Sequence, residues 1–328
     1  RRQLAARVCL DQARPIPKEG LAWPLTWTLQ NNPSQVALGF DDLLAWLVNP
    51  QGAWLQQLGL HPSESVEPIH DLESLQLNAL ERHLLLSADL ENDLIEPEAP
   101  FWRERLAGQG LLPSGAGAVM EDDDLRERWI GLHREVTGFG PARRSNFTLA
   151  EQIHSLLFAG DTHVVVQPGQ LNHRGVLRAW LLHLLLSSTA TKRCDRTAVI
   201  ARSSRGAGAE CHLQWKRLDA VSAHQQLDAL QRLAASGREH CWPVPPRSGW
   251  QLAWQERRKP GSGVAAFRSS WDAEQQQPAL QLCFGTGRDP DGLLANNAFH
   301  EACEVLYSPL LCASTMTMKS RAGSGRRG

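Results

Sequence analysis

The 328-residue sequence lacks the short motifs that mark many nucleotide-binding and hydrolytic active sites. It contains no G-x-x-x-x-G-K-[ST], no G-x-G-x-x-G, no H-E-x-x-H and no G-x-S-x-G. These patterns build a phosphate-binding loop, a dinucleotide-binding turn, a pair of zinc ligands and a serine nucleophile, respectively. The residues that usually carry these four chemistries are therefore absent.

Paired cysteines are also lacking, because the 7 cysteines are scattered and none lies in a C-x-x-C. An odd number at irregular spacing fits reduced thiols better than a disulfide framework or a zinc site. The longest apolar run, residues 180–186, is far shorter than the about 18 to 20 residues of a membrane span. We therefore expect a cytoplasmic protein without a metal site, and the opening Arg1-Arg2 suggests part of a longer protein.

Excess charge of either sign is missing as well. The 34 basic and 35 acidic side chains leave a net charge of −1. No overall field then attracts the chain to nucleic acid or to a membrane, so any contact with DNA has to be local.

Hydrophobic periodicity and turn residues predict a mixed α/β fold. We expect a segment entering from an upstream domain over residues 1–35, one domain over 36–312 and a disordered tail over 313–328. Helices are predicted at 41–47, 54–58, 72–84, 121–132, 172–186, 222–236 (ended by Gly237) and 293–310. Strands are predicted at 146–150, 155–158, 162–166, 197–201, 211–215 and 279–284.

The most informative stretch is residues 161–186, which predicts a buried strand, a turn at Pro168-Gly169 and an amphipathic helix capped by Asn172. Helices followed by a three-stranded meander, a helix and a strand resemble the core of restriction-type PD-(D/E)XK nucleases. Those enzymes need an acidic residue on the second strand and an acidic-x-Lys on the third, to hold Mg²⁺ and orient the attacking water.

This acidic-x-Lys triplet does not occur anywhere in the sequence. The residues two positions before the five lysines are Ile16, Ala190, Gln214, Arg257 and Thr317. The fold is therefore expected without its catalytic residues.

Several longer segments resemble one family, the carboxyl-terminal domain of RecC, the gamma subunit of bacterial exodeoxyribonuclease V. They are GFDDLLAWLVNPQGAWLQQLGL (39–60), DLESLQLNALERHLLL (71–86), VVVQPGQLNHRGVLRAWLLHLLL (164–186), PVPPRSGW (243–250) and LCFGTGRDPDGLLANNAFHEACEVLYSPLL (282–311). The resemblance implies a catalytically degenerate PD-(D/E)XK core with additional amino-terminal helices. It puts Ser155, Val166 and Pro168 at the positions of the two metal-binding carboxylates and the lysine.

The resemblance also implies a role. It points to a non-catalytic scaffold that helps guide DNA in a RecBCD-type helicase-nuclease during double-strand break repair by recombination. The implied partners are a RecB-like helicase-nuclease, a RecD-like helicase, double-stranded DNA ends and unwound single strands. Mg²⁺ and ATP would be used by the partner subunits, with no cofactor in this domain.

DNA contact needs local cations and aromatic rings that can stack on unpaired bases. The best candidates are Arg257, Arg258, Lys259 and Arg268, with Trp250, Trp254 and Trp271 nearby in sequence. A second basic group is Arg202, Arg205, Lys216 and Arg217. Most tryptophans are nevertheless expected to pack in the core.

Two further features have structural interpretations. Carboxylates 121–124 are expected to open a helix and to favour its amino-terminal dipole, and His183 is expected to be a core residue. Two alternatives stay open: an active nuclease using Asp161, Glu151 and Lys192, and a protein-interaction module that never meets DNA.

Overall fold

The computed structural model describes residues 37–62, 77–88, 90–96, 115–149, 152–189, 194–203, 208–239 and 241–315. These fall into two compact units. We call residues 67–228 with 312–328 the sheet unit, and residues 1–66 with 229–311 the helical unit. The predicted leading segment 1–35 and all but three residues of the predicted tail lie outside the described residues.

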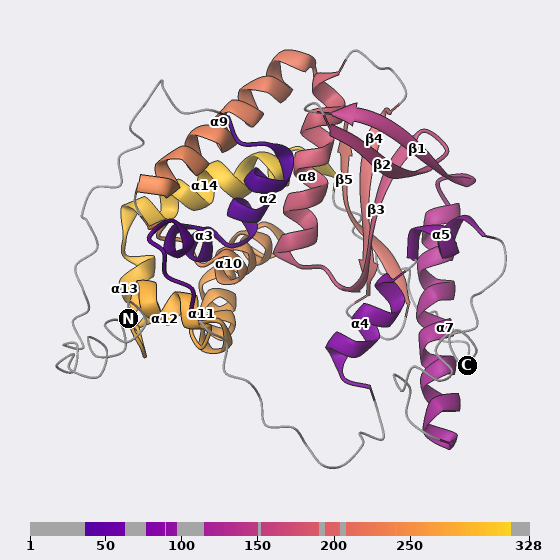
Figure 1. Cartoon of the computed structure of the whole chain (residues 1–328), viewed down its shortest axis with the longest axis horizontal. Helices are drawn as coiled ribbons and strands as arrows, with labels where there is room; N and C mark the ends of the chain where they lie inside the picture. Colours follow the sequence, from indigo (N-terminus) through magenta and orange to yellow (C-terminus); the bar gives the residue numbers. More distant parts are fainter. Residues whose placement is uncertain are drawn as a thin grey trace, which may run out of the picture. The chain divides into compact units, whose positions relative to one another are not determined.

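The sheet unit contains a mixed sheet in the order β1-β2-β3-β4-β5-β6 (Figure 1). Its strands are β1 (Ala142–Leu149), β2 (Gln152–Ala159), β3 (Thr162–Gln170), β4 (Arg196–Arg202), β5 (Ala209–Lys216) and β6 (Ser314–Thr315). Only β3 and β4 are parallel, and α8 (His173–Ser188) connects them. The predicted mixed α/β class and the five strands up to residue 215 are confirmed.

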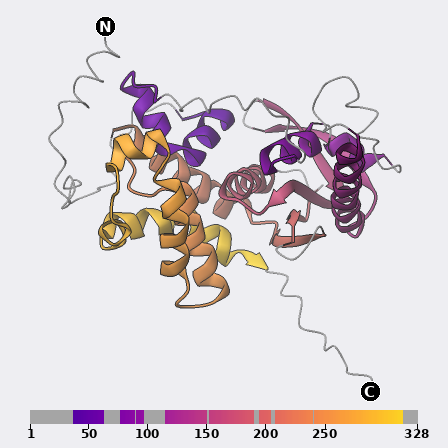
Figure 2. The same ribbon diagram turned by 90° about the horizontal axis from the view of Figure 1, so that it is seen from below.

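The two faces of this sheet are covered by different helices (Figure 2). One face packs against α7 (Ala116–Thr137), α4 (Ala79–Ser87) and α5 (Leu90–Ile95) around Leu157, Val164 and Ile200. The other face packs against α8, where the ring centroids of Trp180 (α8) and Trp215 (β5) are 5.3 Å apart. Because both faces are buried, β3 and β4 are apolar along most of their length, as in parallel strands generally.

The ladder between β2 and β3 is short. Eight residue pairs join β1 to β2, whereas β2 and β3 pair only at Phe158↔His163 and Ala159↔Thr162. We call the divergence of residues 152–157 from residues 164–170 the fork. The turn before the fork needs Gly160, whose φ is +57° and whose added Cβ would lie 2.6 Å from the Phe139 carbonyl oxygen.

The helical unit is built from short helices around aromatic side chains. Its elements are α2 (Phe40–Val48), α3 (Pro50–Gln57), α10 (Pro246–Arg258), α11 (Gly263–Glu274), α12 (Pro278–Phe284), α13 (Pro290–Leu294) and α14 (Asn297–Cys312). The boundary between the two units falls within α9 (Ala220–Glu239). The predicted separation of helices 41–47 and 54–58 is confirmed and falls at Asn49, whose side chain accepts from the Gly52 N–H at 3.1 Å and begins α3.

Four predictions about elements are wrong. Residues 279–284 form α12 rather than a strand, because Pro278 begins a helix whose Leu280 and Phe284 are four residues apart and buried. The predicted helix 293–310 is two helices, α13 and α14. Gly237 does not end α9: a Cβ there would lie 1.9 Å from Trp46 Cζ2, so the glycine permits close packing inside the helix.

The fourth error concerns Pro168-Gly169, where β3 was predicted to end. The strand continues to Gln170, and the register with β4 shifts between Gln167 and Gln170. Proline lacks the N–H that a ladder needs, and a bulge accommodates it without ending the strand.

Candidate functional site

The three positions assigned to lost catalytic residues lie around the fork. Continuing the β2–β3 register by three residues would place Ser155 opposite Val166, although the observed pairing stops before that point. Side chains alternate along a strand, so Ser155 shares a face with Leu157, and Val166 shares it with Val164. Leu157 and Val164 both pack in the apolar cluster beneath α7, and Val166 packs against it.

The side chains at these positions do not fit a magnesium ion. Mg²⁺ takes carboxylate and other oxygen ligands in octahedral geometry, whereas these positions hold an exposed serine, a half-buried valine and a buried proline. Pro168 lies in the bulge, where neither it nor Gly169 has a partner in β4. Within the described residues, no group of three or more His, Cys, Asp or Glu side chains could hold a metal ion.

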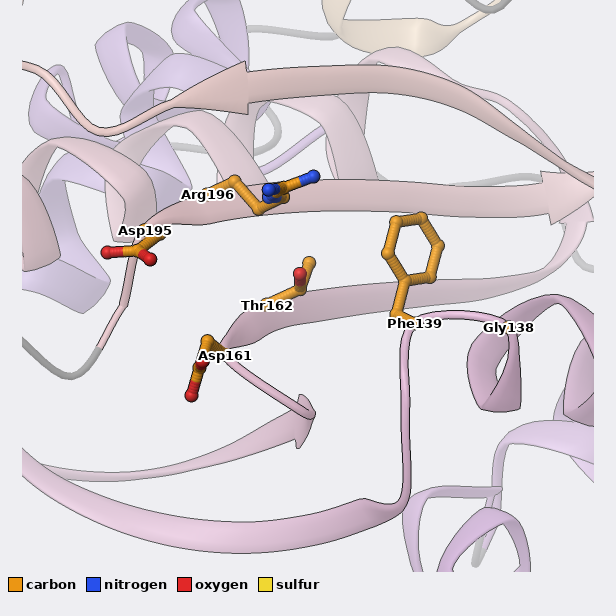
Figure 3. Close-up of a pocket in the computed structure, with 6 residues that line it drawn as sticks. All are labelled: Gly138, Phe139, Asp161, Thr162, Asp195 and Arg196. Carbon is orange, nitrogen blue, oxygen red and sulfur yellow. The ribbon is translucent and has the colours of Figure 1, made fainter.

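Asp161, the proposed ligand of an alternative active nuclease, lies at the other end of β3 (Figure 3). It lines a pocket of about 300 Å³ with Gly138, Phe139, Thr162, Asp195 and Arg196. At about 3.3 Å per residue, Asp161 is on the order of 16 Å from Val166 along the strand. Its supposed partners Glu151 and Lys192 lie outside the described residues, so that constellation stays a prediction.

The acidic run 121–124 does not open its helix. α7 begins at Ala116 and has no acidic residue in its first turn, so the predicted pairing with the helix dipole is wrong. The carboxylates form ion pairs instead: Glu121 with Arg82 at 2.6 Å, Asp122 with Arg126 at 3.3 Å and Asp124 with Arg128 at 2.8 Å. The hydrogen bond from Arg82 lowers the pKa of Glu121. The same ion pair joins α4 to α7.

The tryptophans of the predicted basic-aromatic cluster are buried, whereas its cations are exposed. Trp250, Trp254 and Trp271 are all buried in the helical unit, and Trp271 donates its indole N–H to the Arg288 carbonyl at 2.9 Å. Their rings are therefore not available to stack on bases in this structure. The core interpretation of these tryptophans holds.

The cations of that cluster remain at the surface. Arg257, Arg258 and Lys259 are exposed at the carboxyl-terminal end of α10, with the Arg258 guanidinium 5.6 Å from the Trp254 ring centroid. Arg268 is paired with Asp291 at 2.7 Å. Glu256 caps the following loop by accepting from the Gly261 and Gly263 N–H groups, which lowers the pKa of its carboxyl group.

The second basic group is less accessible. Arg202 is half-buried, Arg217 is half-buried and donates to the Thr189 carbonyl, and Lys216 is exposed. Arg205 lies outside the described residues. These cations are distributed along β4, β5 and their edges and do not converge on one site.

The family assignment follows from a comparison with protein families. The family model described as "RecC C-terminal domain" matches residues 35–257, which is more than half of the chain. The chain belongs to the RecC C-terminal domain family. The resemblance predicted from the sequence is thereby confirmed over that range, whereas the segment 282–311 lies beyond the match. No curated protein matches the chain.

The amino-terminal end of α8 in this RecC C-terminal domain was not predicted as a functional site from the sequence. Asn172 caps the helix as predicted, accepting from the Gly175 N–H at 3.0 Å. Gln167, from β3, extends beneath this first turn and accepts the Asn172 N–H at 3.2 Å. Arg174 and Arg178 are exposed on the same helix. Their four-residue spacing was visible in the sequence, but the nearby Gln167 amide was not.

Between α8 and the sheet lies a buried polar network. The Thr197 hydroxyl is 3.0 Å from His183 Nδ1 and 3.3 Å from His163 Nδ1. Burial lowers the pKa of His163 to about 3 and that of His183 to about 4, so both rings are neutral near pH 7. The prediction that His183 is a core residue is confirmed.

None of the described helices is both long and apolar enough to cross a membrane.

Proposed function

We propose that this chain is a non-catalytic scaffold and DNA-guiding domain of a RecBCD-type helicase-nuclease. Membership of the RecC C-terminal domain family indicates a component of that complex, exodeoxyribonuclease V, which acts in DNA repair and recombination. The partners proposed are a RecB-like helicase-nuclease and a RecD-like helicase, which would supply the Mg²⁺ and ATP chemistry in the cytoplasm. The finer role rests on the residues at the fork.

A single observation carries the non-catalytic part of the proposal. The family resemblance assigns Ser155 and Val166 to the positions where two carboxylates would hold a metal, and an extension of the observed β2–β3 register would place them opposite each other. The side chains found there cannot replace those ligands, and Pro168 cannot replace a lysine, because it offers neither charge nor donor. The succession of α7, β1, β2, β3, α8 and β4 supports such a core.

The DNA-guiding part is supported by exposed cations on a chain whose net charge is −1. Arg257, Arg258 and Lys259 project from the end of α10, and Arg268 extends the group although it is paired with Asp291. Buried tryptophans limit these residues to phosphate contacts, which position a strand without reading its sequence.

A digestion assay tests the absence of catalysis. The purified chain should leave linear duplex and single-stranded DNA intact with Mg²⁺ or Mn²⁺ at concentrations that saturate ordinary nucleases. Metal-dependent cleavage that disappears in Asp161→Ala would support the alternative nuclease and overturn the proposal. A catalytically inactive result for both proteins is the expected one.

Binding of forked DNA tests the guiding role. We expect the affinity for DNA to fall as the salt concentration rises. Arg257→Glu/Arg258→Glu should bind more weakly and with a smaller salt dependence, because fewer phosphate contacts release fewer counterions. Arg232→Glu, which reverses the charge of one exposed arginine of α9, is the control for Arg257→Glu alone. No binding of the unaltered chain at low salt would favour a protein-interaction module that does not contact DNA.

A further inference from the structure

The amino-terminal end of α8 carries charges of the sign that a helix dipole disfavours there. The amino-terminal end of a helix has a partial positive charge, and anionic groups stabilise it. α8 has 16 residues, and its first turn contains no acidic residue. It contains Arg174 instead, and Arg178 follows one turn later.

These two arginines are not neutralised within the described part of the chain. Both are exposed, and neither forms an ion pair with a described carboxylate. Like charges four residues apart on a helix also repel each other. The combination of two cations with a positive helix end costs stability unless an anion binds.

A buried amide provides a separate sign of a missing partner. Gln167 is only 6 % exposed, and its Nε2 donor has no hydrogen-bond partner in the structure. Its Oε1 accepts the N–H of the capping residue Asn172, so the amide is aimed at the amino-terminal end of α8. Each buried donor without a partner costs about 1–3 kcal/mol, and among the several in the described residues this one lies at the amino-terminal end of α8.

The absence of a side chain at Gly175 leaves room for the Gln167 amide. A Cβ at Gly175 would lie 2.0 Å from Gln167 Nε2, so only glycine lets the first turn of α8 close over the amide. The position of the unpaired donor is therefore built into the fold and does not depend on a surface rotamer.

We propose that the amino-terminal end of α8 binds the phosphates of a nucleic-acid strand. The ligand set is the Arg174 and Arg178 guanidinium groups. The positive end of the α8 dipole and the unpaired Gln167 Nε2 beneath it add favourable potential. We call this the α8 site. It rests on the DNA-guiding role proposed above and locates that role on the helix that directly follows the fork.

Phosphate suits the α8 site better than an isolated carboxylate does. Arg174 and Arg178 are about 6 Å apart along the helix axis at 1.5 Å per residue, so each can contact a different phosphate. Guanidinium groups bind phosphate oxygens through two parallel hydrogen bonds, and helix amino-terminal ends bind phosphate through backbone N–H groups. A strand passing the end of β3 would contact both guanidinium groups together.

The test compares two double variants of the full chain by fluorescence anisotropy with labelled single-stranded and forked oligonucleotides. Arg174→Gln/Arg178→Gln removes the charges of the α8 site, and Arg257→Gln/Arg258→Gln removes two charges from α10. Losing two phosphate contacts should lower the log–log salt slope for single-stranded DNA by about 1.4, which is about 25-fold weaker binding near about 0.1 M salt. We expect that loss in the α8 variant.

A second measurement uses inorganic phosphate as the probe. At constant ionic strength, replacing chloride by phosphate should raise the thermal unfolding midpoint of the unaltered chain more than that of Arg174→Gln/Arg178→Gln, because phosphate also stabilises folded proteins without a specific site. This readout does not require DNA binding, and it also shows that the variant folds.

The outcomes separate the two proposals. Binding that is weakened only by the α10 variant would overturn the α8 site and leave the DNA-guiding role intact. Absence of DNA binding by the unaltered chain would overturn the guiding role. In that case, greater stabilisation of the unaltered chain than of the variant by phosphate would identify a free-phosphate site in place of a nucleic-acid site, and equal stabilisation would reject the α8 site altogether.

Discussion

Two exposed basic groups of this chain lie at opposite ends of their helices. Arg257 and Arg258 occupy the last turn of α10, where cations stabilise the negative end of a helix dipole. Arg174 lies in the first turn of α8, where the same charge is unfavourable. The α10 cations therefore have a structural reason to be present, and the α8 cations do not.

The contrast extends to the amino-terminal ends of the two helices. α10 has a buried carboxylate there: Glu274 accepts the Arg247 N–H at 2.9 Å and the Ser248 N–H at 2.7 Å. At α8 the corresponding place is taken by the neutral amide of Gln167. A helix that satisfies its own ends is complete without a ligand, whereas α8 leaves positive charge for one.

The largest expected effect concerns the carboxylate that completes α10. Glu274→Ala should lower the free energy of unfolding by about 3 kcal/mol, because it leaves buried donors without their acceptor. Urea denaturation measures this loss, and the exposed Glu301→Ala on α14 is the control, with a change within about 0.5 kcal/mol. Equal effects of the two substitutions would remove the claim that α10 is internally capped.

A second prediction tests whether His163 and His183, buried beneath α8, are neutral and therefore add no positive charge to it. The pKa of His163 is about 3 and that of His183 about 4 in the folded chain. The ordinary value is about 6.5, so the unfolded chain takes up protons first and stability falls as pH drops below that value.

From about pH 7.5 to about pH 5.5, two such groups cost about 2.7 kcal/mol in the free energy of unfolding. His163→Leu should halve this contribution, since one titrating ring remains. If the variant and the unaltered chain showed the same pH dependence in urea titrations, the buried rings would not be its source.

The smallest effect compares the two basic groups directly. At low salt, Arg174→Gln/Arg178→Gln should stabilise the chain by about 0.5–1 kcal/mol, and Arg257→Gln/Arg258→Gln should destabilise it by a similar amount. Both effects should shrink at about 1 M salt, where charges are screened within about 3 Å. Changes in stability of the same sign in both variants would contradict the claim that cations are unfavourable at the start of α8 and favourable at the end of α10.

Much of the sheet unit was predictable from local sequence. β-branched runs with turn residues located β1 to β5, and Asn172 located the start of α8. The helical unit was harder, because short helices such as α12 have too few residues for periodicity to distinguish them from strands. Pro278 was the available signal, since proline is favourable in the first turn of a helix.

The candidate site was only partly predictable. The sequence alone showed that no acidic-x-Lys triplet is present, because a triplet either occurs or does not. It could not show that Trp254 and Trp271 are buried, since burial depends on which helices pack together. Nor could it bring Gln167 beneath Gly175, because that approach depends on how the chain turns after the bulge at Pro168.

The fork also has a consequence for how this domain opens. The β1–β2 hairpin has eight internal residue pairs and joins β3 through two. Regions held by few connections exchange their amide hydrogens through local opening, independently of global unfolding. The hairpin should therefore open at Gly160 before β3, β4 and β5 lose protection, with the packing of Leu157 beneath α7 as the contact that limits this opening.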